Sequence, residues 1–169
     1  MGFKKASELI TISTKVTESA ANTFTQLEVS LDLDPISREI FVVTDVMLDP
    51  DAPSAVAGAI TSTKSSVSTT SRTSVGNISD SEVMQTVIDR VYGGAAEFNF
   101  ARTAMPNELA TTGTQNDYLA IISTSNFFLQ IEGTLNTAAR EAHCRLIGYR
   151  AKADADTYAA LVASEVLSA

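Results

Sequence analysis

The chain has 169 residues, a mass of 17.9 kDa and a formal net charge of −8, from 12 Lys and Arg residues against 20 Asp and Glu residues. Apolar residues make up 44% and charged residues only 19%, while 20 Thr and 18 Ser residues supply much of the rest. This composition excludes a coiled coil, a disulfide scaffold and a collagen-like chain. The length predicts a single domain over residues 1–169 that can bury its own core.

The N-terminal part predicts three strands. Residues 9–17 are rich in β-branched side chains. Residues 27–33 alternate Leu and Val with polar residues, as in a half-buried strand. In residues 39–48 apolar side chains occur on both predicted faces, so the strand must be covered on both. One face carries Val42, Val46 and Leu48, and the other carries Phe41, Val43 and Met47.

The next segment is polar and is followed by a helix signal. Residues 58–75 are dominated by Ser and Thr and contain no acidic residue. They predict an exposed edge hairpin, with a disordered loop as the alternative. Residues 79–82 (Ser-Asp-Ser-Glu) match a capping box, and Gly93-Gly94 supplies a stop. Because the apolar residues between them fit helical spacing, we expect a helix over residues 80–92.

The C-terminal part predicts further strands and a second helix. Residues 96–102, 118–124, 126–132 and 142–151 are expected to be strands, with a loop over 103–116. A C-terminal helix over 153–169 would be capped by Asp154 or Asp156. The count is about eight short strands without β–α alternation. It predicts a mainly β protein: an antiparallel β-sandwich of jelly-roll type with one inserted and one C-terminal helix.

The chain has few residues of the types that serve in catalysis or metal binding. His143 and Cys144 are the only histidine and cysteine. Neighbours on a strand point to opposite faces, which makes a Cys–His dyad from these two geometrically poor. One Cys and one His also cannot supply the usual zinc ligands. We therefore expect no enzyme, no catalytic residue and no cofactor. Asp49 and Asp51 could offer two carboxylates to calcium, with a solvated acidic loop as the alternative.

Two regions, residues 41–48 and 119–131, predict strands that are apolar on both faces. A helix such as 80–92 could cover the second face within the chain, and neighbouring subunits could cover it in an assembly. With stretches such as 117–132 and 145–150, most of the chain resembles small single-jelly-roll viral capsid proteins. Many icosahedral coat proteins carry a basic N-terminal arm, whereas here only Lys4 and Lys5 precede the first strand.

The resemblance implies a virion structural protein, a capsid subunit that assembles into a shell through contacts with copies of itself. Other virion proteins are further candidate partners. The expected location is the virion, after synthesis in the host cytoplasm without a signal peptide. The candidate interface residues are the large apolar residues of the doubly apolar strands and of the C-terminal helix: Phe41, Val43, Met47, Phe127, Phe128, Tyr158 and Leu161.

Other classes of function stay open. A ligand-binding or carbohydrate-binding β-sandwich module is the main alternative, although the chain has no Trp and only four Tyr residues for stacking on sugar rings. An acid/base enzyme is a third class, without a specific carboxylate pair. Direct nucleic-acid binding is not expected, because no basic run exceeds Lys4-Lys5. No apolar stretch approaches the 18 residues that indicate a membrane span.

Overall fold

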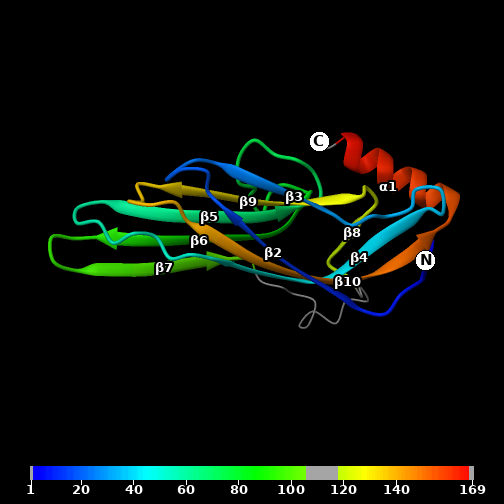
Figure 1. Ribbon diagram of the computed structural model, residues 1–169, viewed down its shortest axis with the longest axis horizontal. Helices are drawn as coiled ribbons and strands as arrows, with labels where there is room; N and C mark the ends of the chain where they lie inside the picture. The colour runs from blue at the N-terminus through cyan, green and yellow to red at the C-terminus, as the bar shows by residue number, and fades with distance from the viewer. Residues whose placement is uncertain (1, 106–117, 168–169) are drawn as a thin grey trace.

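The computed structural model describes residues 2–105 and 118–167 and contains two five-stranded antiparallel sheets (Figure 1). In the first sheet, β1 (Phe3–Lys5) and β2 (Ile10–Thr17) pair with successive parts of β10 (Glu141–Ala153), followed by β4 (Glu39–Pro50) and β8 (Ala120–Ile122). The second sheet has the order β3 (Thr25–Ser30), β9 (Asn126–Thr134), β5 (Ile60–Ser68), β6 (Val83–Gly93) and β7 (Phe98–Ala104). A helix, α1 (Ala155–Leu167), follows β10.

The strands pair in a nested pattern. β5 pairs with β6, β4 with β8, β3 with β9, and β2 with β10. The chain therefore runs outward and returns along itself as one long hairpin, which is wound so that its strands fall into two sheets. This is a winding of jelly-roll type. The predicted antiparallel β-sandwich is confirmed, with ten strands in the described residues rather than eight.

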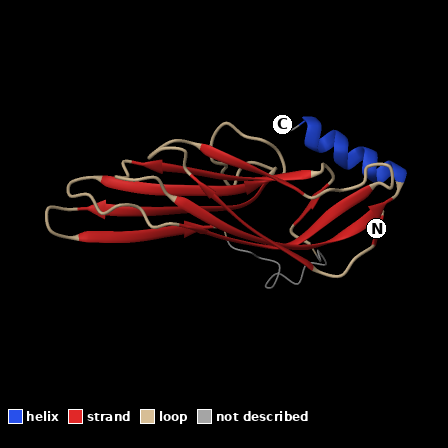
Figure 2. Ribbon diagram, viewed as in Figure 1, coloured by secondary structure: helices blue, strands red, loops and turns tan. Residues whose placement is uncertain are grey.

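The main core lies where the two sheets overlap, near the middle of an elongated molecule (Figure 2). The β6–β7 turn lies at one end of the molecule and α1 at the other (Figure 1). The core takes large apolar side chains from both sheets, and the largest fully buried ones include Phe41, Phe127, Leu129, Ile131 and Leu146. The alternation of apolar residues along each strand sends them to this shared interior.

A β-bulge in β4 changes which of its side chains share a face, so the two predicted faces of this strand are wrong in part. The register between β4 and β10 shifts at Ile147 and Gly148, whose partners are Asp45 and Val43, so Thr44 has no opposite residue. One extra residue reverses which side chains face the core. Val42 therefore does not share a face with Val46. The main core receives Phe41, Val43, Val46 and Leu48, whereas Ile40 and Val42 face the other side.

The other side of β4 is covered by α1. Ile40 and Val42 form a second buried cluster with Ala151 and Ala153, against which Tyr158 and Leu161 pack. The expectation that this strand is covered on both faces is confirmed for residues 40–43, where the cover comes from the C-terminal helix. Further along the strand, Met47 is exposed. Within residues 2–105 and 118–167, no helix has the length and apolar character of a membrane span.

The C-terminal helix itself agrees with the prediction. Asp154 is the cap: its Oδ1 accepts a hydrogen bond from the Thr157 backbone N–H at 2.8 Å. Residues 168–169, and most of the predicted loop at 103–116, lie outside the described residues.

The predicted helix at 80–92 is wrong, because residues 83–92 belong to β6 and residues 80–82 precede it. Val83, Val87 and Val91 are four residues apart, a spacing that fits one face of a regular strand as well as of a helix. In β6 a register shift skips Met84, so that Met84 and Val87 face the main core and Val83 does not. Many residues of the segment are β-branched, which favours the strand. The polar residues of the supposed capping box form a turn instead, in which Asp80 Oδ2 accepts hydrogen bonds from the Asn77 backbone N–H and from Arg72.

The predicted exposed hairpin or loop at 58–75 is also corrected. Residues 60–68 form β5, which lies between β9 and β6 and is buried along most of its length. Hydrogen bonds satisfy its outer face. Ser66 Oγ donates to Gln130 Oε1 and accepts from the Gly76 N–H, each at 2.8 Å, and Gln130 Nε2 donates to Ser68 Oγ at 2.7 Å. The 69–82 loop thus folds back over this face.

Candidate assembly surface

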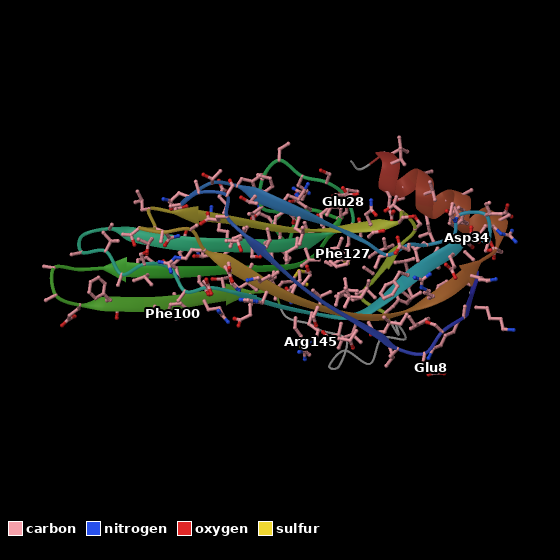
Figure 3. The ribbon with its side chains drawn as sticks, in the orientation of Figure 1. Glu8, Glu28, Asp34, Phe100, Phe127 and Arg145 are labelled. Carbon is pink, nitrogen blue, oxygen red and sulfur yellow. The ribbon has the colours of Figure 1, made fainter. Side chains whose placement is uncertain are left out.

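Three of the seven candidate interface residues lie inside the protein. Phe41, Val43 and Phe127 are fully buried in the main core between the sheets, and Figure 3 shows Phe127 in the middle of the molecule. They stabilise the chain's own fold and have no surface to offer a neighbour. Their alternation predicted burial correctly, but burial against other strands of the same chain.

The other four candidates do not form one patch. Tyr158 and Leu161 are half-buried against the second cluster beneath α1. Met47 is 50% exposed on the first sheet, and Phe128 is half-buried on the second sheet, in a shallow hollow that also contains Thr70 and Val166. The structure therefore keeps Tyr158 and Leu161 together on α1 and places Met47 and Phe128 on different sheets.

The most exposed apolar strand is β7, which the candidate residues missed. All seven of its residues are exposed, and it forms an edge of the second sheet. Phe98 and Phe100 are 48% and 55% exposed, and Figure 3 shows Phe100 at the margin of the molecule. The sequence did contain a signal: a Phe-x-Phe alternation in a short predicted strand whose partner face had no assigned cover.

An ion-pair network holds β7 in place. Arg102 Nε and Nη2 donate to the two carboxylate oxygens of Asp89, each at 2.7 Å, and Asp89 is fully buried. Arg102 Nη1 and Nη2 also lie 3.2 Å from Asp49 Oδ1 on β4. These hydrogen bonds, chiefly the one to Asp89, raise the pKa of Arg102. One guanidinium thus connects β7 to β6 in its own sheet and to β4 in the other sheet.

The two calcium candidates have protein partners. Asp49 accepts from Arg102, and Asp51 Oδ2 accepts a hydrogen bond from the Glu141 backbone N–H at 3.0 Å. No group of three or more His, Cys, Asp or Glu side chains with a metal-binding arrangement occurs in the described residues. In the structure, Asp49 is thus bound to β7 and Asp51 to the start of β10.

The two unique side chains lie on opposite faces of β10, as their adjacency predicts. His143 is exposed, and its Nε2 lies 3.8 Å from Glu141 Oε2. Cys144 is buried in the main core, and burial raises the pKa of its thiol to about 12. The thiol is therefore protonated at neutral pH, and a thiol in this state is a poor nucleophile.

One cavity of about 280 Å³ lies between α1 and the strands β6 and β8, lined by Met84, Ile121 and Leu161 among others. The carboxylate of Glu165 reaches its wall, where Oε1 accepts from the Ser123 N–H and Oε2 from the Thr124 N–H, each at 2.8 Å. This carboxylate is thus engaged in fastening the end of α1 to the β8–β9 turn.

Comparison with known proteins adds no assignment: the chain matches no known protein-family profile, and no curated protein is significantly similar to it.

Proposed function

We propose that this protein is a virion structural protein, a capsid-type subunit that assembles with copies of itself into a shell. The observation that carries the proposal is a jelly-roll winding that leaves the aromatic edge strand β7 exposed along its whole length. Jelly rolls of this kind build viral capsids, although they also occur in lectins and cupins, so the fold supports the proposal by analogy. An exposed, apolar edge strand adds a physical reason for association.

The charge of the chain shapes how it would assemble. A net charge of −8 makes copies repel one another, and salt screens such repulsion beyond about 10 Å at 0.1 M ionic strength. Assembly should therefore be favoured by added salt. The same net negative charge does not favour binding to nucleic-acid phosphates. In the proposed virion, another component therefore neutralises the nucleic acid.

The test is assembly of the purified full chain. Light scattering and negative-stain electron microscopy, across protein concentration and from low to high salt, should show discrete particles or oligomers whose population rises with salt. A monomer under every condition would overturn the proposal.

A carbohydrate-binding module is the second candidate, because Phe98 and Phe100 could also stack on sugar rings. Glycan-array binding that is lost in Phe98→Ala and Phe100→Ala, without particle formation, would favour that function instead. Retained assembly and a silent array would favour the shell.

A further inference from the structure

The hydrogen bonds of β7 define which of its backbone groups lack a partner in the sheet. Met105 N–H donates to Thr86 O at 3.0 Å, and Gly94 N–H donates to Glu97 O at 2.8 Å, in register with the β6–β7 ladder. In an antiparallel ladder, hydrogen-bonded pairs alternate with non-hydrogen-bonded pairs. Odd-numbered residues of β7 therefore bond to β6, and the even-numbered ones turn their N–H and C=O groups outward: Phe98, Phe100, Arg102 and Ala104.

We propose that β7 pairs antiparallel with β7 of a second copy, across a two-fold axis at Ala101, so that the two second sheets become one continuous sheet. This inference rests on the proposed function and names the contact that it would use. The register places Phe98 opposite Ala104 of the second copy and Phe100 opposite Arg102 of the second copy. Each of these is a pair of outward-bonding residues, as an antiparallel ladder requires.

The side chains suit this register. Phe98, Phe100, Arg102 and Ala104 share one face of the strand. A large side chain meets a small one in the first pair, and an aromatic ring meets a guanidinium in the second, a favourable cation–π combination. Shifting the axis to Arg102 would oppose two like charges, and shifting it to Phe100 would leave Ala104 unpaired. The register at Ala101 alone uses all seven residues of the strand.

The other edges of the described sheets are less suited to this pairing. β1 and β8 are only three residues long. β2 presents the charged side chain of Lys15, a residue type that discourages edge pairing. In β3, Gln26 is bound by the neighbouring loop through Ser71. In β7, by contrast, the charged residue is Arg102, whose guanidinium is neutralised by Asp89 within the same chain.

Disulfide trapping tests the axis directly. The two Ala101 residues would form a non-hydrogen-bonded pair with Cα atoms about 4.5 Å apart, a separation that a disulfide can bridge. Ala101→Cys in the full chain should give a covalent dimer as its main product on mild oxidation. Asn99→Cys is the matched control on the same face, because the two Asn99 residues would be about 13 Å apart. The native Cys144 is buried and does not compete.

A proline variant tests the same contact without a crosslink. Phe100→Pro removes an outward-pointing N–H and leaves the ladder to β6 intact, a position where edge strands tolerate proline. It should weaken association about tenfold or more, with a thermal unfolding midpoint close to that of the Phe100→Ala control. Association equal to that of Phe100→Ala would contradict the proposed ladder.

The outcomes separate the two proposals. Wild-type particles together with an Ala101→Cys dimer, and no Asn99→Cys dimer, support both. Wild-type particles without the Ala101→Cys dimer, or with equal crosslinking of both variants, overturn the β7 contact and leave the shell function standing. A wild-type protein that stays monomeric and an Ala101→Cys variant that does not crosslink overturn both.

Discussion

The strands β4 and β5 are interior strands of the two sheets, and their outer faces are buried by different kinds of contact, apolar packing for β4 and hydrogen bonding for β5. Each lies between two neighbours, and each has buried residues on both faces. β4 is apolar, and its outer face packs beneath α1. β5 is made largely of Ser and Thr, and its outer face is covered by the 69–82 loop through hydrogen bonds. Burial in this protein is therefore not tied to hydrophobicity.

The two outer faces differ in how strictly they determine the segment that packs on them. An apolar face gains stability from any well-shaped apolar cover, because the hydrophobic effect has no direction. A buried polar face requires each donor and acceptor to find its partner, since an unsatisfied group costs about 1–3 kcal/mol. The helix over β4 should thus tolerate small changes, whereas the loop over β5 should depend on particular atoms.

The largest effect is expected on the apolar strand. Phe41→Ala removes a fully buried ring from the main core and should lower the free energy of unfolding by about 3–5 kcal/mol. Chemical denaturation with urea measures the loss. Met47→Ala, on the exposed side of the same strand, is the control and should cost less than about 1 kcal/mol. Equal losses would mean that β4 is not packed as described.

The stability that comes from the polar strand β5 should depend nearly as strongly on one side-chain amide, that of Gln130. Gln130→Ala removes the partner of Ser66 and Ser68 on a fully buried face, and it should cost about 2–3 kcal/mol by the same measurement. The triple change Ser66→Ala, Ser68→Ala and Gln130→Leu replaces all three polar groups together. Because this variant also removes the serine partners of the Gly76 N–H and the Thr70 C=O, it should lose more stability than Gln130→Ala. An equal or smaller loss would contradict the described polar network.

A smaller effect is expected for the cover of β4. Tyr158 is half-buried against Ile40 and Val42, so Tyr158→Ala should cost about 1–2 kcal/mol. Tyr158→Phe keeps the ring and should be close to wild type. Thermal unfolding followed by circular dichroism compares them, and a Tyr158→Phe variant as unstable as Tyr158→Ala would indicate that the hydroxyl, not the ring, matters.

The sequence was informative where one residue pattern had one structural meaning. The alternating apolar residues near 27–33 and the β-branched run at 9–17 became β3 and β2, and the Asp154 cap was found. The Val83, Val87 and Val91 spacing fitted both a helix and a strand, and only pairing with β5 and β7 decides between them. The Ser/Thr run of β5 gave no sign of burial, because its partners, such as Gln130, are distant in sequence.

Three of the candidate interface residues, Phe41, Val43 and Phe127, are buried within the chain for a related reason. A strand that is apolar on both faces, as around Phe41, must be covered, but the pattern does not name the cover. The bulge at Thr44 leaves no distinct pattern in the sequence, yet it decides which residues face α1. The edge position of Phe100 likewise depends on the order of strands in the sheet, which the sequence alone does not determine.

The smallest effect concerns the start of α1 and depends on pH. The Thr157 backbone N–H holds the pKa of Asp154 below its usual value. A carboxylate with a lowered pKa in the folded state stabilises the protein above its unfolded pKa of about 4, and this contribution is lost as the pH falls through the folded value. Asp154→Ala should therefore lower the unfolding midpoint at pH 7 more than at pH 2. Asp156→Ala is the neighbouring control, and an identical pH profile for both variants would contradict the cap.

The nested pairing of the strands also constrains the order in which the protein can form. β5 and β6 are near each other in the chain and can pair early, whereas Thr17 can pair only after Glu141 has been synthesised. Pairings so distant in sequence close slowly. β10 follows the other nine strands of the described residues in the chain, and yet it lies between β2 and β4. During synthesis, the first sheet therefore lacks a central strand until residues 141–153 have been made, and β2 and β4 stay without this partner until then.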